Sequence, residues 1–375
     1  MIDSELRVPF VVPLIGEDEV AAVAAVLRSG HLAQGPQVAA FEREFASVAG
    51  CAFTVAMNSG TAAQHAALES MGIADGDEVL TTPFTFAATA TPILQQRATP
   101  RFADIDPRTF NLDASAALAA CGPATKAVTL VDLFGLPIDP AGIPALRARG
   151  IRVIEDACQA VGASFGGVAA GAIGDAASFS FYATKNVTTG EGGMLTTADP
   201  QIAEAARRFR HHGQGDRYEY VSLGYNYRMT DVAAAIGRVQ LGRLASIGAA
   251  RRANAAFYDR ELGGIPGVQT PFVPPGAEHV YHQYSLLIDG NATPNGATRD
   301  DVRTLLAALR IDSGVYYPKP LHLQPLFSNL GYGPGDFPVA ERVAKQILAI
   351  PIHPLLERAQ LEHTVKALRR AVGAA

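Results

Sequence analysis

The sequence predicts an α/β fold with a mainly parallel central sheet covered by helices. Helical and strand patterns alternate through the first two-thirds of the 375 residues, as they do where helices join parallel strands. Short apolar runs bounded by Gly, Pro or Asp recur there, which is typical of buried strands. The chain is longer than one hydrophobic core usually serves, so we expect a large domain and a smaller one.

The expected elements follow in order along the chain. Amphipathic spacing predicts a helix over Glu17–Ser29, and Pro36 opens a second helix before the sheet begins. The apolar runs then predict buried strands at Phe53–Met57, Glu78–Thr81, Ala127–Val131, Arg152–Ile154 and Ala177–Phe181.

The pattern changes beyond Met229, where a long helical pattern continues to Leu262. After the Pro- and Gly-rich stretch that follows, the sequence predicts a strand at Gln283–Ile288 and helices at Thr298–Leu309 and Pro338–Ile347. We therefore expect a large domain over residues 1–245, including the N-terminal helices, and a small C-terminal α/β domain over residues 246–375.

Composition and charge argue against several function classes. The formal net charge of -5 comes with no long basic run, so neither a nucleic-acid surface nor a polybasic membrane patch is expected. No segment reaches the ~20 apolar residues of a membrane span, and the first twenty residues lack the pattern of a secretory signal. We expect a cytoplasmic protein with small-molecule partners. Scattered cysteines without CxxC spacing agree with a reducing compartment; they are Cys51, Cys121 and Cys158.

The histidines do not predict a metal site. His211 and His212 are adjacent and would point in different directions, while His279 and His282 lack a matching second pair. We expect surface or supporting roles for them and no bound metal.

The first candidate binding segment is NSGTAA at residues 58–63, where a strand-like run breaks at Gly60 and a helical pattern begins. A helix N-terminus built from small residues offers free N–H groups and a positive dipole end to a phosphate, and the Thr61 hydroxyl is a further donor. When this segment is taken alone, a plain helix cap is the favoured explanation.

Three further segments supply polar and aromatic groups after expected strands. Asp156 ends an apolar strand, where a carboxylate would face a bound cofactor and could keep a pyridine nitrogen protonated; Gln159 could share its face. A capping role for Asp156 is the alternative.

Lys185 follows a buried aromatic strand and precedes a glycine-rich stretch, so desolvation would lower its pKa and make its amine a nucleophile. A solvated surface lysine is the alternative. Ser180, on the same strand, could donate to a phosphate. Phe86, in a loop after another strand, could stack on a planar ring, while Phe84 is expected in the core.

Taken together, these segments resemble the DegT/DnrJ/EryC1/StrS family of sugar aminotransferases, a branch of the fold-type I pyridoxal-phosphate (PLP) enzymes. The order and spacing of the matches make the resemblance specific. The matching segments are GHLAQGPQVAAFEREFA, NSGTAAQHAAL, PFTFAATA, FADIDPRTFNLD, VIEDACQAVGA, FSFYATKNVTTGEGG, LGYNYRMTDVAAAIGRVQL, HVYHQYSLL and YYPKPLHLQP.

The resemblance implies PLP as cofactor and a role for each matching residue. Lys185 would form the Schiff base and move protons, Asp156 would bind the pyridine nitrogen, and Gln159 would lie near the ring hydroxyl. Phe86 would stack on the ring. The phosphate would be bound by Gly60, Thr61, Ser180 and, from the second subunit of a homodimer with shared active sites, Asn226.

The resemblance also implies the reaction. An amino acid, expected to be glutamate, would donate its amine to a nucleotide-linked keto sugar such as a 4-keto-6-deoxy hexose. Tyr317, His322 and Arg228 would lie near that substrate. Some family members carry histidine in place of the lysine and catalyse dehydration, so Lys185 favours transamination.

Two other functions stay open at this stage. A keto-cyclitol or an aminobenzoate precursor could replace the nucleotide sugar, and activity without a nucleotide would reveal it. A regulatory protein that binds the cofactor without turnover is disfavoured by the complete set of Lys185, Asp156 and Gln159. A dinucleotide-binding dehydrogenase is disfavoured because the glycines at 190–193 do not open a βαβ unit.

Overall fold

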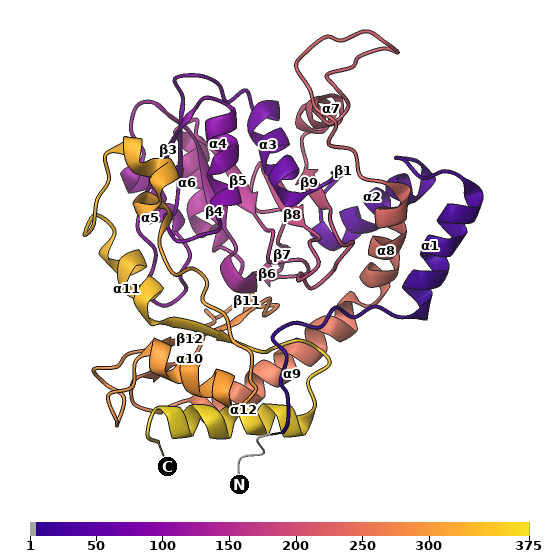
Figure 1. Ribbon diagram of the computed structural model, residues 1–375. Coiled ribbons are helices and arrows are strands. Elements are labelled where there is room, and N and C mark those ends of the chain that lie inside the picture. The colour runs from indigo at the N-terminus through magenta and orange to yellow at the C-terminus, as the bar shows by residue number, and fades with distance from the viewer. Residues whose placement is uncertain (1–4, 375) are drawn as a thin grey trace.

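The structure, a computed structural model, describes residues 5–374. The outermost ends of the two expected domains, residues 1–4 and 375, lie outside the described residues. Figure 1 shows a large part built around a wide sheet and a smaller part below it, connected by a long diagonal run of helix. Both ends of the described chain lie at the smaller part.

The large part is built on a seven-stranded sheet. Its strands are β1 (Phe53–Met57), β2 (Glu78–Thr81), β3 (Thr99–Phe102), β4 (Thr125–Val131), β5 (Arg152–Asp156), β8 (Ala176–Ser180) and β9 (Gly193–Thr197). They lie in the order β1-β9-β8-β5-β4-β2-β3. All neighbours from β8 to β3 are parallel, while β9 is antiparallel to both of its neighbours. The predicted α/β class with a mainly parallel sheet is confirmed.

Helices cover both faces of this sheet. The helices on the first face are α3 (Gly60–Ser70), α4 (Thr91–Gln95) and α7 (Pro200–Phe209). Those on the second face are α2 (Pro36–Ala49), α5 (Ala114–Ala120) and α6 (Ile143–Ala148). Successive side chains of β5 point to opposite faces of the sheet. Ile154 packs with α3 on the first face, and Val153 packs with α6 on the second.

Local sequence signals fix several of these helix ends. Pro36 stands at the first position of α2, and Gly50 ends the helix in the left-handed conformation with φ 63°, which a glycine adopts at little cost. The Asp199 side chain accepts a hydrogen bond of 2.8 Å from the Gln201 N–H and so caps α7.

The smaller part has its own sheet and core. Its sheet has the order β10-β12-β13; the strands are β10 (Val268–Gln269), β12 (Tyr284–Ile288) and β13 (Ile347–Ile350). Its helices are α10 (Arg299–Ala308), α11 (Pro338–Gln346) and α12 (Arg358–Ala371). The connecting helices are α8 (Asp231–Gly242), on which α1 (Glu17–Ser29) packs, and α9 (Leu244–Leu262). A small third sheet is formed by β6 (Ser164–Phe165), β7 (Val168–Ala169) and β11 (Ala277–Glu278).

Two expectations about elements need correction. The helix predicted over Pro338–Ile347 ends at Gln346, because Ile347 begins β13. Strands β3 and β9 were not predicted. The proline at position 100 hides β3, and it is tolerated because β3 is an edge strand. No helix among residues 5–374 has the length and apolar character to cross a membrane.

We propose the division at residues 245 and 246 as the domain boundary, which lies near the start of α9. Some contacts cross it. Val8 packs in the core of the smaller part, and its N–H donates to the Arg310 carbonyl at 2.9 Å. At a second contact, Phe337 at the start of α11 packs against Phe102 of the large sheet.

Candidate active site

The N-terminus of α3 meets the end of β8 at the carboxyl edge of the sheet, where open α/β folds bind ligands. A Cβ atom built on Gly60 would lie 2.9 Å from the Ser180 Cβ and 2.9 Å from the Cys158 Sγ. Only glycine therefore fits here without displacing its neighbours. The structure brings Gly60, Thr61 and Ser180 to one place, and the free N–H groups of the first turn of α3 lie there with them.

The Asp156 carboxylate lies at the end of β5 and is fixed by two donors. The Thr89 hydroxyl donates to Oδ2 at 2.6 Å, and the Cys158 N–H donates to Oδ1 at 3.2 Å. Thr89 in turn shares a hydrogen bond of 2.8 Å with the Thr85 hydroxyl. Sequence reasoning missed Thr89, although its spacing of four from Thr85 in a loop after a strand was a visible signal.

Lys185 follows β8 in a turn that is closed by a 2.8 Å hydrogen bond from its N–H to the Tyr182 carbonyl. Burial lowers the pKa of the Lys185 amine, and the nearby Cys158 and Asp156 oppose this shift. Among residues 5–374, no hydrogen bond or ion pair to the Lys185 side chain is found. A partly desolvated, unpaired amine close to a carboxylate is suited to attack a carbonyl carbon.

Gln159 connects the site to the smaller part of the molecule. Its Oε1 accepts a 2.8 Å hydrogen bond from the Phe134 N–H, and its Nε2 donates to the Tyr317 hydroxyl at 3.3 Å. Burial raises the pKa of Tyr317, whereas the bond from Gln159 lowers it. The tyrosine is therefore a neutral hydroxyl at neutral pH.

Phe86 and Tyr317 form an aromatic rim. The Phe86 side chain is 60 % exposed, which is unusual for phenylalanine. Its ring centroid lies 6.2 Å from that of Tyr317. Phe84, as expected, is fully buried. Phe86 directly precedes the turn that carries Thr89. The Phe86 ring and the Thr89 hydroxyl that contacts Asp156 therefore come from the same short loop.

Asn226 and Arg228 lie on a segment that runs beside the chain leading into α3. The Asn58 N–H donates to the Tyr227 carbonyl at 2.8 Å, and the Asn58 side chain donates to the Asn226 carbonyl at 3.3 Å. The Arg228 guanidinium is 2.7 Å from Nδ1 of His211. The Asn226 side chain is exposed, so another molecule could reach it.

His322 differs from the expected substrate contact. Its side chain is fully buried, with Nε2 at 3.2 Å from Oε1 of Glu341 and the ring packed edge-on to Phe337 at 4.8 Å. In this arrangement the imidazole presents no surface to a substrate. It holds the segment that carries Tyr317 against α11 instead.

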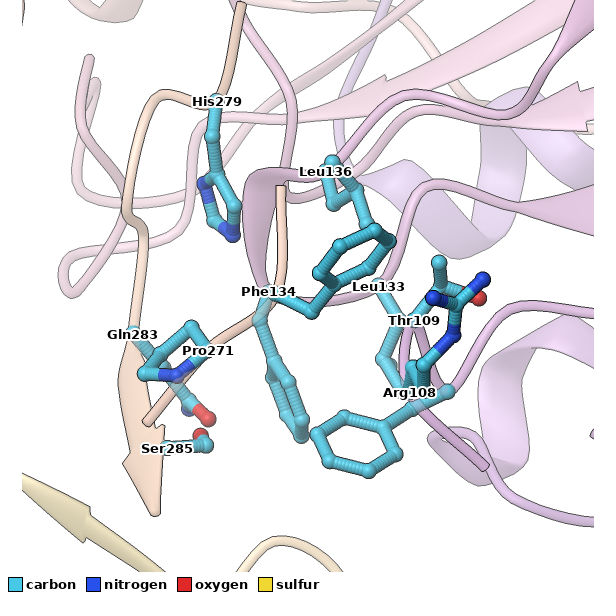
Figure 2. Close-up of a pocket in the computed structure, with 11 residues that line it drawn as sticks. Arg108, Thr109, Leu133, Phe134, Leu136, Pro271, His279, Gln283 and Ser285 are labelled. Atoms are coloured by element: carbon cyan, nitrogen blue, oxygen red, sulfur yellow. The ribbon is translucent and has the colours of Figure 1, made fainter. Parts of the chain in front are cut away.

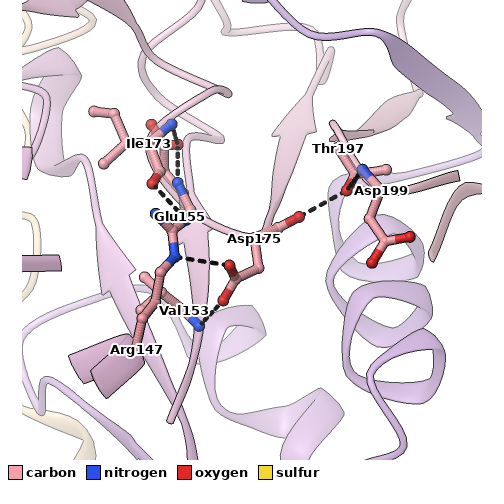
Figure 3. A network of polar contacts seen from close by, with 8 residues as sticks. Arg147, Val153, Glu155, Ile173, Asp175, Thr197 and Asp199 are labelled. Carbon is pink, nitrogen blue, oxygen red and sulfur yellow. Dashed lines mark hydrogen bonds and ion pairs between the residues drawn. The ribbon is translucent and has the colours of Figure 1, made fainter. Parts of the chain in front are cut away.

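The strand that ends at Asp156 is braced from the opposite face (Figure 3). The Glu155 carboxylate accepts a 2.9 Å hydrogen bond from the Gly171 N–H. Asp175 accepts from the Val153 N–H at 2.7 Å and pairs with Arg147 at 2.9 Å. These contacts fix the register and the end of β5 before any ligand is bound.

A separate small cavity lies between the two parts of the molecule (Figure 2). Its volume is about 10 Å³, enough for roughly one water molecule. None of the expected site residues lines it. Its lining residues are Arg108, Thr109, Phe110, Leu133, Phe134, Leu136, Pro271, Phe272, His279, Gln283 and Ser285. Within the described part of the chain, no cluster of three or more His, Cys, Asp or Glu side chains is arranged to hold a metal ion.

The residues present fit PLP. The glycine cradle beside Ser180 and the start of α3 suit a phosphate, and the exposed Phe86 ring suits one face of a planar ring. Asp156, oriented by Thr89, is suited to a protonated ring nitrogen. The unpaired Lys185 amine lies near Asp156 and completes the set.

Comparison with known proteins agrees with this geometry. The model of the DegT/DnrJ/EryC1/StrS aminotransferase family matches residues 13–369. The chain is 40 % identical to the spore coat polysaccharide biosynthesis protein SpsC of Bacillus subtilis, over 97 % of each chain. It is 36 % identical to dTDP-3-amino-3,4,6-trideoxy-alpha-D-glucose transaminase of Streptomyces venezuelae, over 97 % of this chain and 96 % of the relative.

A solved structure shows the same fold. The X-ray structure of S. venezuelae DesV in complex with a ketimine intermediate superposes with a TM-score of 0.93 at 34 % identity, covering 98 % of this chain and 99 % of that one. The fold-type I expectation is confirmed. The chain is a PLP-dependent aminotransferase and belongs to the DegT/DnrJ/EryC1/StrS family.

Proposed function

We propose that this protein transfers the amine of glutamate to a nucleotide-linked keto sugar such as a 4-keto-6-deoxy hexose. The observation that carries the proposal is the grouping of the unpaired Lys185 amine with Asp156 beside the Gly60 cradle. The transaminase from S. venezuelae, whose name contains a dTDP-linked amino sugar, supports the substrate class.

PLP, when bound, supplies a ring that withdraws electrons from the substrate carbon bearing the nitrogen. We propose that Gly60, Thr61 and Ser180 bind its phosphate and that Asp156 holds the proton on its ring nitrogen. Gln159 would lie beside the ring hydroxyl, and Phe86 would cover one ring face and exclude water from it.

Lys185 would hold the cofactor covalently and, once released, move protons. A lysine with a lowered pKa releases its proton more readily than an exposed lysine does, so its amine can take a proton from one carbon and return it to another. Tyr317 borders the same space, because its hydroxyl accepts from Gln159. We propose it as a substrate contact, with His322 holding its segment in place.

We further propose a homodimer in which Asn226 reaches the phosphate site of the partner, with Arg228 on the same shared surface. Large apolar side chains are exposed on the loop leading to Asn226, which favours burial against a second copy; they are Tyr218, Tyr220, Val221 and Leu223. Mixing inactive Asn226→Ala and Lys185→Ala proteins should restore activity, because one of the two mixed sites is then intact. Activity no higher than in the unmixed variants would count against the shared site.

An optical experiment tests the transfer reaction. Glutamate should convert the PLP form to the pyridoxamine form, and a nucleotide keto sugar should restore the original absorbance. Lys185→Ala should block both changes. A response only to a keto-cyclitol would change the substrate class, and no response to glutamate would remove the donor from the proposal.

A further inference from the structure

Two acidic side chains lie buried behind the cofactor-facing aspartate. Asp132 follows β4 and Glu155 precedes Asp156 on β5, and both are completely buried. Leu130 pairs with Glu155 across the two strands. Because side chains alternate along a strand, Asp132 and Glu155 share the face covered by α6, and Asp156 points to the face covered by α3.

The hydrogen bonds of the two carboxyl groups are unequal. Glu155 accepts from three N–H groups, those of Gly171 at 2.9 Å, Ile173 at 3.1 Å and Gly174 at 3.4 Å. Asp132 accepts at Oδ1 from the Ile138 N–H at 2.9 Å. Its other oxygen, Oδ2, finds no donor among the described residues.

The group that meets Asp132 is the Glu155 carboxyl itself. Two buried carboxylates in contact would repel each other, and each would lack solvation. A proton on Asp132 converts its unpaired oxygen into a donor, whereas a proton on Glu155 would be placed among N–H donors. The hydrogen bonding therefore selects Asp132 as the protonated member.

We propose that Asp132 is a neutral acid that donates a hydrogen bond to the Glu155 carboxylate, and that this pair positions Asp156 while carrying one negative charge instead of two.

The surroundings support this assignment. Burial raises the pKa of Asp132, and the charges of Glu155 and Asp156 raise it further. Burial also raises the pKa of Glu155, but the hydrogen bonds from Asp132 and from the N–H groups of residues 171, 173 and 174 lower it. A further titratable neighbour is the Cys51 thiol, which is neutral because burial and the charge of Glu155 raise its pKa to about 11.

The pair acts on Asp156 through the backbone. The Asp132 N–H donates to the Asp156 carbonyl at 3.0 Å, and Glu155 is its chain neighbour. The singly protonated pair therefore fixes the adjacent ends of β4 and β5 and places one negative charge, in place of two, near the Asp156 carboxylate. The role for Asp156 rests on the proposed function, whereas the protonation of Asp132 does not.

Infrared difference spectroscopy of the holoenzyme at neutral pH tests the proton directly. Subtracting the spectrum of Asp132→Asn from that of the wild type should leave the C=O band of one protonated carboxyl group. Asp175→Asn is a matched control, since Asp175 pairs with Arg147 at 2.9 Å, and it should show loss of a carboxylate band only. A carboxylate band in place of the acid band for Asp132→Asn would overturn the proposal.

A second measurement separates the two members of the pair. Asp132→Asn keeps a donor toward Glu155, so its thermal midpoint and PLP dissociation constant should stay close to wild type, the latter within about twofold. Glu155→Gln places an amide donor against backbone N–H groups and should lower the midpoint strongly or prevent folding. Loss of PLP binding by a folded Asp132→Asn would contradict the proposal. If the C=O band of protonated Asp132 is present but the enzyme catalyses no transamination, the proposed function is contradicted and the protonation of Asp132 is not.

Discussion

The Thr89 hydroxyl donates a 2.6 Å hydrogen bond to Oδ2 of Asp156. Thr89 lies in the short helical turn Ala87–Thr89 and Asp156 at the end of β5, and both are buried. A hydroxyl that donates a hydrogen bond to a carboxylate fixes the orientation of that carboxylate. The contact therefore prepares Asp156 for a cationic partner, which the protonated ring nitrogen of PLP would be.

Replacing Thr89 tests this relationship. Thr89→Val keeps the shape and removes the donor, so the PLP dissociation constant should rise about tenfold, corresponding to the ~1–2 kcal/mol of a charge-assisted hydrogen bond. Thr89→Ser keeps the donor and should remain near wild type in the same fluorescence titration. Equal behaviour of the two variants would show that the hydroxyl does not orient Asp156.

A methyl group at Gly60 should damage the phosphate site. The added Cβ of Gly60→Ala would lie 2.9 Å from both Ser180 and Cys158, so α3 must shift away from β8. We expect at least about a tenfold weaker PLP affinity, of the size that displacing one charge-assisted contact gives. Gly242→Ala is the matched control, because no atom lies within 4 Å of its added Cβ. Unchanged PLP affinity in Gly60→Ala would argue against the cradle.

The lowered pKa of Lys185 predicts an unusual reactivity profile. In the cofactor-free protein, acetylation of Lys185, followed by mass spectrometry, should set in at lower pH than that of the exposed Lys126. Asp156 opposes the effect of burial, so Asp156→Asn should lower the pKa of Lys185 further and move its profile to still lower pH. A shift to higher pH in Asp156→Asn would contradict the assigned electrostatics.

His65 should make the protein sensitive to acid. Its Nδ1 lies 3.1 Å from the Tyr227 hydroxyl, and burial lowers its pKa from 6.5 to about 4. The unfolded chain then binds a proton that the folded chain does not between these two values, so stability falls as pH drops from 6.5 to 4. The loss should be on the order of 2 kcal/mol of unfolding free energy. When the unfolding free energy is measured with denaturant at several pH values in this range, it should fall less steeply with decreasing pH in His65→Gln than in the wild type.

The burial of His322 predicts a stability effect. His322→Phe removes the 3.2 Å contact with Glu341 and should cost about 1–2 kcal/mol of unfolding free energy, as for a broken buried hydrogen bond. Glu341→Gln should cost a similar amount, and the double variant less than the sum, because both changes remove the same contact. A higher KM for the keto sugar without any loss of stability would return His322 to the role of substrate contact.

Much of the site was readable from local sequence. A helix start with small residues, an apolar strand ending in Asp156 and a lysine after an aromatic strand each depend on neighbouring residues, since periodicity and turn chemistry are set within a few positions. The structure brings Gly60 and Ser180 together as expected, because parallel strands present their carboxyl ends at one edge.

Only the tertiary structure decided the rest. Thr89 and Asp156 are 67 residues apart, β9 enters the sheet antiparallel between β1 and β8, and the imidazole of His322 turns inward to Glu341. The pairing of Asp132 with Glu155 is of the same kind. Such contacts arise when packed elements bring distant side chains together and burial forces each polar group to find a partner, and no local pattern in the chain encodes that choice.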